Sequence, residues 1–166
     1  MNIAQARKNS IDNQIRPWGG LDYIANNALK SVPREEFVPD HYKNLAFADI
    51  EIPLSNKAKM LSPKVEGRLL DALNIQKNET VLEVGTGSGY LTAVLSKLCQ
   101  SVTSIEIDET LSQGAQEKLK QLNINNVTLE VGDASKGWQR STDFFDVVVI
   151  STSVPKITGR FFHLLN

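Results

Sequence analysis

The sequence predicts an α/β fold of the doubly wound class, with a mostly parallel sheet and helices on both of its faces. Three observations predict it. From residue 62 onward, short apolar segments alternate with longer amphipathic segments, which is typical of strands joined by crossover helices. A glycine-rich turn at 85–89 follows the first of these strands and opens a helix. The segment 147–150 is apolar throughout, as expected of a strand that is covered on both faces.

The alternating elements begin with a helix. We expect it to start at Pro63, with the Ser62 hydroxyl as its cap, because proline is tolerated in the first helical position. Its buried stripe is predicted to be Val65, Leu69, Leu70 and Leu73. The later elements are expected to be strand 80–84, helix 91–98, strand 102–107, helix 111–122, strand 127–131, strand 145–150 and helix 157–165.

The part of the chain before residue 60 is more polar and richer in turns. We expect helices over about 3–15 and 20–31, and a loop from 53 to 63. Trp18 is expected to pack against a helix end, with contact to a substrate as the alternative. With 166 residues, the chain predicts one compact domain. Within this domain we expect an N-terminal cap of helices and loops (1–60) that packs on an α/β core (61–166).

The composition excludes several classes of protein. Eighteen lysines and arginines against nineteen aspartates and glutamates give a formal net charge of −1, so we expect no nucleic-acid binding through bulk charge. The single cysteine excludes an internal disulfide and a cysteine-rich zinc site, and we expect no metal. No apolar run approaches the ~20 residues that span a bilayer, and no signal peptide is visible. We therefore expect a cytoplasmic protein that does not bind membranes.

The glycine-rich turn carries the main functional signal. It reads Gly85-Thr86-Gly87-Ser88-Gly89 and follows Glu83 in the predicted strand. Glycines permit positive φ angles and let a ligand approach the backbone closely. The dinucleotide-binding pattern places its third glycine where this chain has Tyr90. A carboxylate at position 83 repels a pyrophosphate and favours a cationic ligand, such as an ammonium or a sulfonium. A tight strand–helix turn without a ligand is the alternative.

Two further acidic residues follow the next strands. Glu106 lies near the end of the predicted strand 102–107, 21 residues after Gly85, where a carboxylate is positioned to accept hydrogen bonds from ribose hydroxyls. Asp133 takes the corresponding place after the third strand. Ligands of such sheets bind at the carboxyl ends of the strands, which is where both acids are expected. An exposed strand-end carboxylate at 106 and ordinary turn chemistry at 133 are the alternatives.

These motifs resemble those of class I S-adenosylmethionine-dependent methyltransferases, whose first motif is an acid followed by the same glycine pattern. The segments 32–38 (Val-Pro-Arg-Glu-Glu-Phe-Val) and 132–138 (Gly-Asp-Ala-Ser-Lys-Gly-Trp) resemble the protein-L-isoaspartate O-methyltransferase family in particular. The resemblance runs from about residue 8 to the end of the chain. It implies a Rossmann-like methyltransferase fold, S-adenosyl-L-methionine as the cofactor, and isoaspartyl carboxylates of damaged proteins or peptides as the acceptors.

The resemblance also implies roles for individual residues. Asp133 would contact the exocyclic amine of adenine. The cofactor-binding residues that it implies are Glu83, Gly85, Thr86, Gly87, Ser88, Gly89, Glu106, Ile107, Asp133 and Ala134.

Two departures from the family pattern concern the acceptor and the length of the chain. The family's serine that contacts the acceptor carboxylate aligns with Leu61, and Ser62, one position away, is the candidate catalytic residue. We also expect the family's C-terminal strands to be missing, as in a truncated chain. The first departure leaves open an acceptor of another kind, either a small molecule or another protein group. A module that binds the cofactor without catalysis is the third hypothesis.

Overall fold

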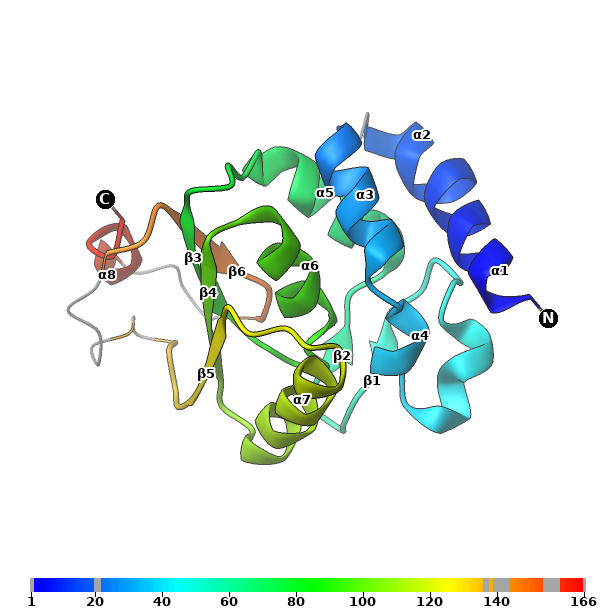
Figure 1. Ribbon diagram of the computed structural model, residues 1–166. Coiled ribbons are helices and arrows are strands. Elements are labelled where there is room, and N and C mark those ends of the chain that lie inside the picture. The colour runs from blue at the N-terminus through cyan, green and yellow to red at the C-terminus, as the bar shows by residue number, and fades with distance from the viewer. Residues whose placement is uncertain (1, 20–21, 136–137, 139–143, 154–158, 166) are drawn as a thin grey trace. The chain divides into compact units, whose positions relative to one another are not determined.

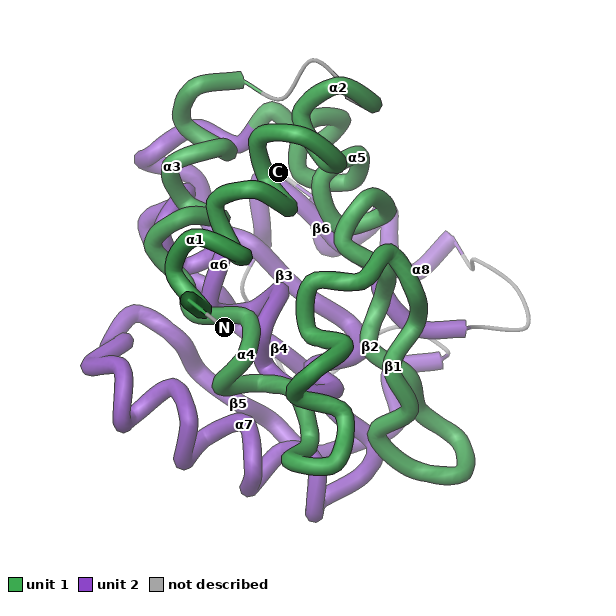
Figure 2. The backbone as a smooth tube through the Cα atoms, turned by 90° about the vertical axis from the view of Figure 1, so that its right-hand side faces the viewer, with its two compact units in different colours: residues 1–74 green, residues 75–166 purple. Residues whose placement is uncertain are grey.

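The computed structural model describes residues 2–19, 22–135, 138, 144–153 and 159–165. The chain divides into two compact units, residues 1–74 and residues 75–166, which Figure 2 shows in different colours. The helix that begins at Pro63 belongs to the first unit. The second unit contains the parallel sheet and the glycine-rich turn.

A parallel sheet organises the second unit. In the described part of the chain it has four strands, β3 (Thr80–Val84), β4 (Ser101–Glu106), β5 (Val127–Val131) and β6 (Val147–Ile150). Their order is β5-β4-β3-β6, and every neighbouring pair is parallel. The two central strands are therefore β3 and β4, and their carboxyl ends lie side by side at one edge of the sheet. The predicted parallel α/β sheet is confirmed.

Helices cover both faces of this sheet. The path from β3 through β4 to β5 runs in one direction across the sheet, so right-handed crossovers place α6 (Tyr90–Leu98) and α7 (Glu109–Gln121) on the same face. Figure 1 shows α8 (Gly159–Phe162) on the opposite side. Residues 157 and 158 of the predicted last helix lie outside the described residues.

A cluster of apolar side chains forms the core on the α8 side of the sheet. Apolar side chains of β3 and β4 pack there against residues that follow β5 and β6. This cluster consists of Leu82, Val84, Ile105, Ala134, Trp138, Phe145, Phe161 and Leu164. The central strands β3 and β4 are therefore largely buried on both sides, whereas β6, whose apolar run 147–150 predicted such burial, is half-buried except at Val149.

The first unit begins with three helical segments in succession. They are α1 (Ile3–Ser10), the π-helical turn η1 (Ile11–Ile15) and α2 (Arg16–Gly19), where the sequence predicted one helix over 3–15. Pro17 lacks an N–H and removes the regular bond to the carbonyl four residues before it. The turn that precedes it is wider, and the Arg16 N–H donates to the Ile11 carbonyl. Lys64, in the first turn of the helix that begins at Pro63, lies 4.6 Å from the centroid of the Trp18 ring, so the expected contact with a helix end is present, although the side chain remains 62% exposed.

The segment after α2 contains more structure than the sequence predicted. The predicted second helix is present as α3 (Tyr23–Ser31), and α4 (Arg34–Phe37) and a 3₁₀ helix (Asp40–Leu45) follow it. The loop expected over 53–63 instead contains an antiparallel hairpin of β1 (Ile52–Pro53) and β2 (Lys59–Met60). Strands of two residues are too short to show an alternating pattern, which is why the sequence did not predict them.

Helix α5 (Pro63–Leu73) starts at the predicted residue but buries a partly different face. Leu70 is buried as expected, whereas Val65 is 49% exposed and Glu66 is buried. Glu66 is buried because it forms an ion pair with Arg34, which is also buried. The spacing of the apolar residues therefore did not predict the buried face of α5 correctly, because the Arg34–Glu66 pair lies inside the unit.

Among the residues that the structure describes, no helix is long and apolar enough to cross a lipid bilayer.

Candidate functional site

The turn between β3 and α6 adopts a conformation that requires its glycines. Gly85, Gly87 and Gly89 have φ angles of 104°, 53° and 83°, in the region that other residues rarely adopt. A Cβ atom at position 85 would also lie 2.7 Å from Cβ of Thr152. The Ser151 hydroxyl donates to the Gly85 carbonyl at 2.9 Å and holds the start of the turn.

Glu106 connects this turn to the end of β4. Its Oε2 accepts the Gly87 N–H at 2.8 Å, and its Oε1 accepts the Asp108 N–H at 3.0 Å. The side chain is 7% exposed, so it is not the exposed strand-end carboxylate of the alternative interpretation. Each oxygen has further lone pairs that remain available to a ligand.

A small cavity of about 100 Å³ lies at the carboxyl ends of the strands in the second unit. It brings together five of the residues that the sequence singled out, Gly85, Glu106, Ile107, Asp133 and Ala134. Ile107 is 69% exposed beside Glu106, and Asp133 is also exposed. The other lining residues are Val84, Ile105, Gly132, Ser135, Thr152 and Ser153.

The remaining predicted residues lie behind this cavity. Glu83 is fully buried in β3, and its Oε2 accepts hydrogen bonds from Thr92 at 2.5 Å and Ser104 at 2.7 Å. The hydroxyls of Ser104 and Thr86 are 2.6 Å apart, so this buried network reaches into the turn. Ser88 is buried as well, and its Oγ accepts the Tyr90 N–H. These residues do not line the cavity.

Burial sets the charge of Glu83. Removal from water raises the pKa of this carboxyl to about 7, although the hydrogen bonds from Ser104 and Thr92 favour the ionised form. Its Oε1 has no hydrogen-bond partner among the residues that the structure describes. The residue therefore acts on the turn through Ser104 and Thr86, not through an exposed carboxylate.

Sequence reasoning missed the hydroxyl residues that support the turn. Ser104 lies in β4 beside the buried Ile105, and Thr92 lies in α6 between Leu91 and Ala93. Both side chains are completely buried. A polar residue at a position that the periodicity assigns to the core was the available signal, because such a residue needs a buried partner.

The Trp138 ring leaves no room for a side chain at Gly132, the first residue of the segment 132–138 after β5. A Cβ atom at Gly132 would lie 2.7 Å from two ring atoms of Trp138. Trp138 is buried in the cluster on the α8 side, so the ring cannot move away freely. Residues 136 and 137 of this segment lie outside the described residues.

The candidate acceptor residues lie in the first unit, at the start of α5. Asp49 Oδ1 accepts the Lys64 N–H at 3.1 Å, and the Ser62 side chain makes no cap bond, so the predicted cap is wrong. The Ser62 hydroxyl instead lies near Asp49. Burial disfavours the charge of Asp49, but the hydrogen bonds from Lys64, the Lys64 charge and the nearby Ser62 hydroxyl outweigh it and lower the pKa.

Leu61, which aligns with the family's serine, is held by its backbone. Its carbonyl accepts a hydrogen bond from Arg34 Nη2 at 2.8 Å. Arg34 also donates to the Ala46 carbonyl at 2.9 Å and is paired with Glu66. Burial raises the pKa of Glu66, and the Arg34 charge opposes this effect. The side chain at position 61 offers no polar group to a ligand.

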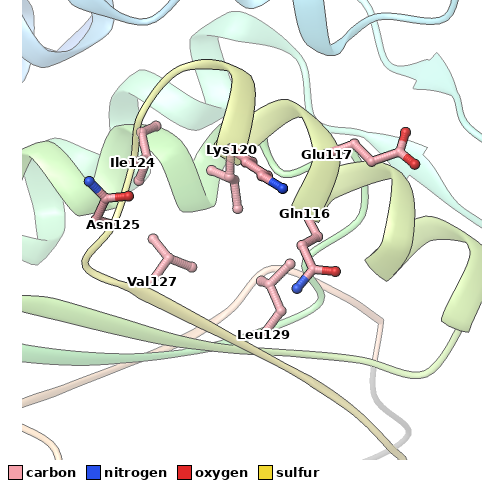
Figure 3. A pocket seen from close by; sticks show the side chains of 8 residues that line it. Gln116, Glu117, Lys120, Ile124, Asn125, Val127 and Leu129 are labelled. Carbon is pink, nitrogen blue, oxygen red and sulfur yellow. The ribbon is translucent and has the colours of Figure 1, made fainter.

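A larger cavity of about 510 Å³ lies between α7 and β5 (Figure 3). Figure 3 shows that its side chains come from α7, from β5 and from the loop that joins them. None of the residues predicted to bind a cofactor lines it. The smaller cavity beside Glu106 is therefore the candidate site.

Comparison with known proteins identifies the family. The protein-L-isoaspartate(D-aspartate) O-methyltransferase family matches residues 8–166. The chain is 34% identical over 165 residues to the protein-L-isoaspartate O-methyltransferase of Petrotoga mobilis, covering 99% of this chain and 78% of that protein. The chain belongs to this family.

Two solved structures of protein-L-isoaspartate O-methyltransferases share the fold of this chain. One protein-L-isoaspartate O-methyltransferase has a TM-score of 0.83 at 23% identity; the match covers 96% of this chain but about half of the other, 52%. A second, from Plasmodium falciparum, was solved in complex with S-adenosyl-L-homocysteine. It has a TM-score of 0.81 at 20% identity over 96% of this chain and 79% of the other.

Proposed function

We propose that this protein is an S-adenosyl-L-methionine-dependent O-methyltransferase that methylates isoaspartyl carboxylates of proteins or peptides. The observation that carries the proposal is the turn at 85–89, in which Gly85 lines the candidate cavity and the Gly87 N–H binds the Glu106 carboxylate. Membership of the isoaspartate O-methyltransferase family supports the same reaction. The Plasmodium relative solved with S-adenosyl-L-homocysteine supports the same cofactor.

The residues of the cavity fit the nucleoside part of this cofactor. The free lone pairs of Glu106 can accept the ribose hydroxyls, and Asp133 can accept the adenine amine. The exposed side chain of Ile107 offers an apolar surface to the adenine ring. When bound, the cofactor supplies an electrophilic methyl group.

Ser62 is the proposed acceptor-orienting residue. Because Asp49 caps the Lys64 N–H, the Ser62 hydroxyl is not needed at the start of α5. The Ser62 hydroxyl lies near Asp49, and its one proton can be donated to an acceptor carboxylate. A carboxylate is already a nucleophile at neutral pH, and its alignment is the main task of the protein.

Calorimetric titration tests the cofactor proposal. We expect saturable binding of S-adenosylmethionine and S-adenosylhomocysteine, with no competition by NAD. Glu106→Ala removes a charged acceptor, and each hydrogen bond to a charged group is worth ~1.5–3 kcal/mol, so affinity should fall about 10- to 100-fold. Glu109→Ala, at an exposed position in the first turn of α7, is the matched control and should bind normally. Preferential binding of NAD would contradict the proposal.

A methyl-transfer assay with isoaspartyl and matched aspartyl peptides tests the acceptor. Transfer should be confined to the isoaspartyl peptide, and Ser62→Ala should slow it about 10- to 1000-fold without changing cofactor affinity. Leu61→Ser should raise the rate, whereas Leu61→Ala, which removes the same bulk without adding a hydroxyl, should not. If Ser62→Ala keeps full activity, the proposed role of Ser62 is wrong.

Leu61 favours a second candidate function, methyl transfer to an acceptor other than an isoaspartyl residue. The family's acceptor-binding hydroxyl is missing at this position, and only the backbone carbonyl of Leu61 is engaged. This alternative predicts that cofactor binding is normal while both peptides remain unmethylated. It also predicts that Leu61→Ser does not methylate either peptide.

A further inference from the structure

The exposed tryptophan of the first unit is fixed against α5. Trp18 is 62% exposed, and an indole of this size on a surface is typical of binding sites. Its backbone carbonyl accepts a hydrogen bond from Arg68 Nη1 at 3.1 Å. Lys64 Nζ lies 4.6 Å from the centroid of the indole ring. Lys64 and Arg68 are one helical turn apart, so both cations reach the same side of α5.

One positive charge of this cluster is unbalanced. Lys64 Nζ forms an ion pair with Asp49 Oδ2 at 3.0 Å. Arg68 is exposed and pairs with no carboxylate in the described ranges, and only one of its donors is used by Trp18. A guanidinium binds a carboxylate through two parallel hydrogen bonds, which the remaining donors of Arg68 permit.

Asp49 connects the cluster to the proposed acceptor hydroxyl. It contacts Lys64 through both of its oxygens, and the Ser62 hydroxyl lies close enough to its carboxylate to favour the ionised form. Ser62 and Arg68 are six residues apart along α5, which corresponds to a rise of about 9 Å. An extended peptide covers this distance in about three residues at ~3.4 Å each.

We propose that Trp18, Lys64 and Arg68 form a subsite that binds a second carboxylate of the acceptor. In a peptide this carboxylate is an acidic side chain two or three residues from the isoaspartyl residue, and its methylene groups pack on the indole of Trp18. The proposal rests on the proposed function for the identity of the acceptor, because it takes Ser62 as the place of the methylated carboxylate. It adds a preference for acidic sequences around the site of damage.

Quenching of tryptophan fluorescence by acrylamide measures binding without methyl transfer. Trp138, the other tryptophan of the chain, is 6% exposed, so the accessible signal comes from Trp18 and should be lost in Trp18→Phe. Two isoaspartyl peptides are compared, one with glutamate and one with glutamine at the third position from the isoaspartyl residue. The glutamate peptide should shield Trp18 and bind about 3- to 10-fold more tightly.

The variants identify the charge that makes this difference. Arg68→Gln should remove the discrimination between the two peptides, whereas Lys8→Gln, which removes an exposed charge from α1, should retain it. Equal binding of the two peptides by the unmodified protein would overturn the proposal, and so would discrimination that persists in Arg68→Gln.

The same peptides separate this proposal from the proposed function. If Arg68 discriminates between the peptides but neither is methylated, the subsite stands and the proposed reaction fails. If both peptides are methylated with the same kcat/KM, the reaction stands and the subsite is refuted.

Discussion

Replacing Glu83 by glutamine tests the effect of a buried carboxyl on the stability of the second unit. The group is fully buried, and its Oε2 accepts the Thr92 and Ser104 hydroxyls. Burial raises its pKa from an ordinary value of 4.5 to about 7. The folded protein therefore retains a proton on Glu83 over a pH range in which the unfolded chain has lost it.

The sign and the size of the effect follow from this shift. Because the folded-state pKa lies above the unfolded value, the stabilisation is complete below pH 4.5 and is lost as the pH rises through about 7. At about 1.4 kcal/mol per pKa unit, the whole shift is worth about 3 kcal/mol. About 2–3 kcal/mol of it falls between about pH 5 and about pH 8.

Urea unfolding at these two pH values, followed by circular dichroism, measures the effect. Glutamine keeps the shape of the side chain and can accept both hydroxyls, but it cannot titrate. Between about pH 5 and about pH 8 the unmodified protein should lose about 2–3 kcal/mol of its free energy of unfolding through Glu83. Glu83→Gln should lack this loss. Glu117→Gln, on the exposed side of α7, is the control and should follow the unmodified protein.

The comparison refutes the reasoning if Glu83→Gln and the unmodified protein show the same pH dependence. Glu83 would then be ionised in the folded protein throughout this range. The two hydroxyl donors would in that case outweigh the cost of burial.

Two other substitutions test packing and charge pairing. Arg34→Met leaves Glu66 buried without its partner and should lower the free energy of unfolding by about 3–5 kcal/mol, measured in urea; the double variant with Glu66→Leu should recover most of this loss. A loss as large in the double variant would show that the backbone bonds of Arg34 matter more than the buried charge. Gly132→Ala places a Cβ atom against the Trp138 ring and should cost about 1–3 kcal/mol in thermal unfolding. Gly114→Ala, in α7 with no atom within 4 Å of the added Cβ, should instead stabilise by up to about 1 kcal/mol, and equal effects at the two glycines would contradict the steric argument.

The second unit was largely predictable from the sequence because its signals are local and long enough to be periodic. The bounds of β3 and β5 agree with the predicted strands 80–84 and 127–131. The glycines at 85, 87 and 89 predicted a turn with positive φ angles, which the structure contains. The cavity then gathers residues from β4 and from the segments after β5 and β6, because parallel strands end at one edge of the sheet.

The first unit was less predictable because charged residues stabilise its interior. Burial of Glu66 depends on Arg34, 32 residues earlier in the chain, and no local period predicts such a pair. The cap of α5 likewise comes from Asp49, which is distant in sequence from the predicted cap Ser62. Trp18 was expected at a helix end, but its contacts with Lys64 and Arg68 of α5, which leave it mostly exposed, depend on residues about 50 positions later in the chain.

Arg34 makes the shape of the segment before α5 independent of the side chain at position 61. Arg34 donates a hydrogen bond to the backbone carbonyl of Leu61, a group that every amino acid possesses. A change between serine and leucine at this point therefore alters the side chain without disturbing the path of the backbone. Under the proposal that this segment meets the acceptor, the acceptor preference can change here at little cost in folding, because recognition and architecture then depend on different atoms of the same residue.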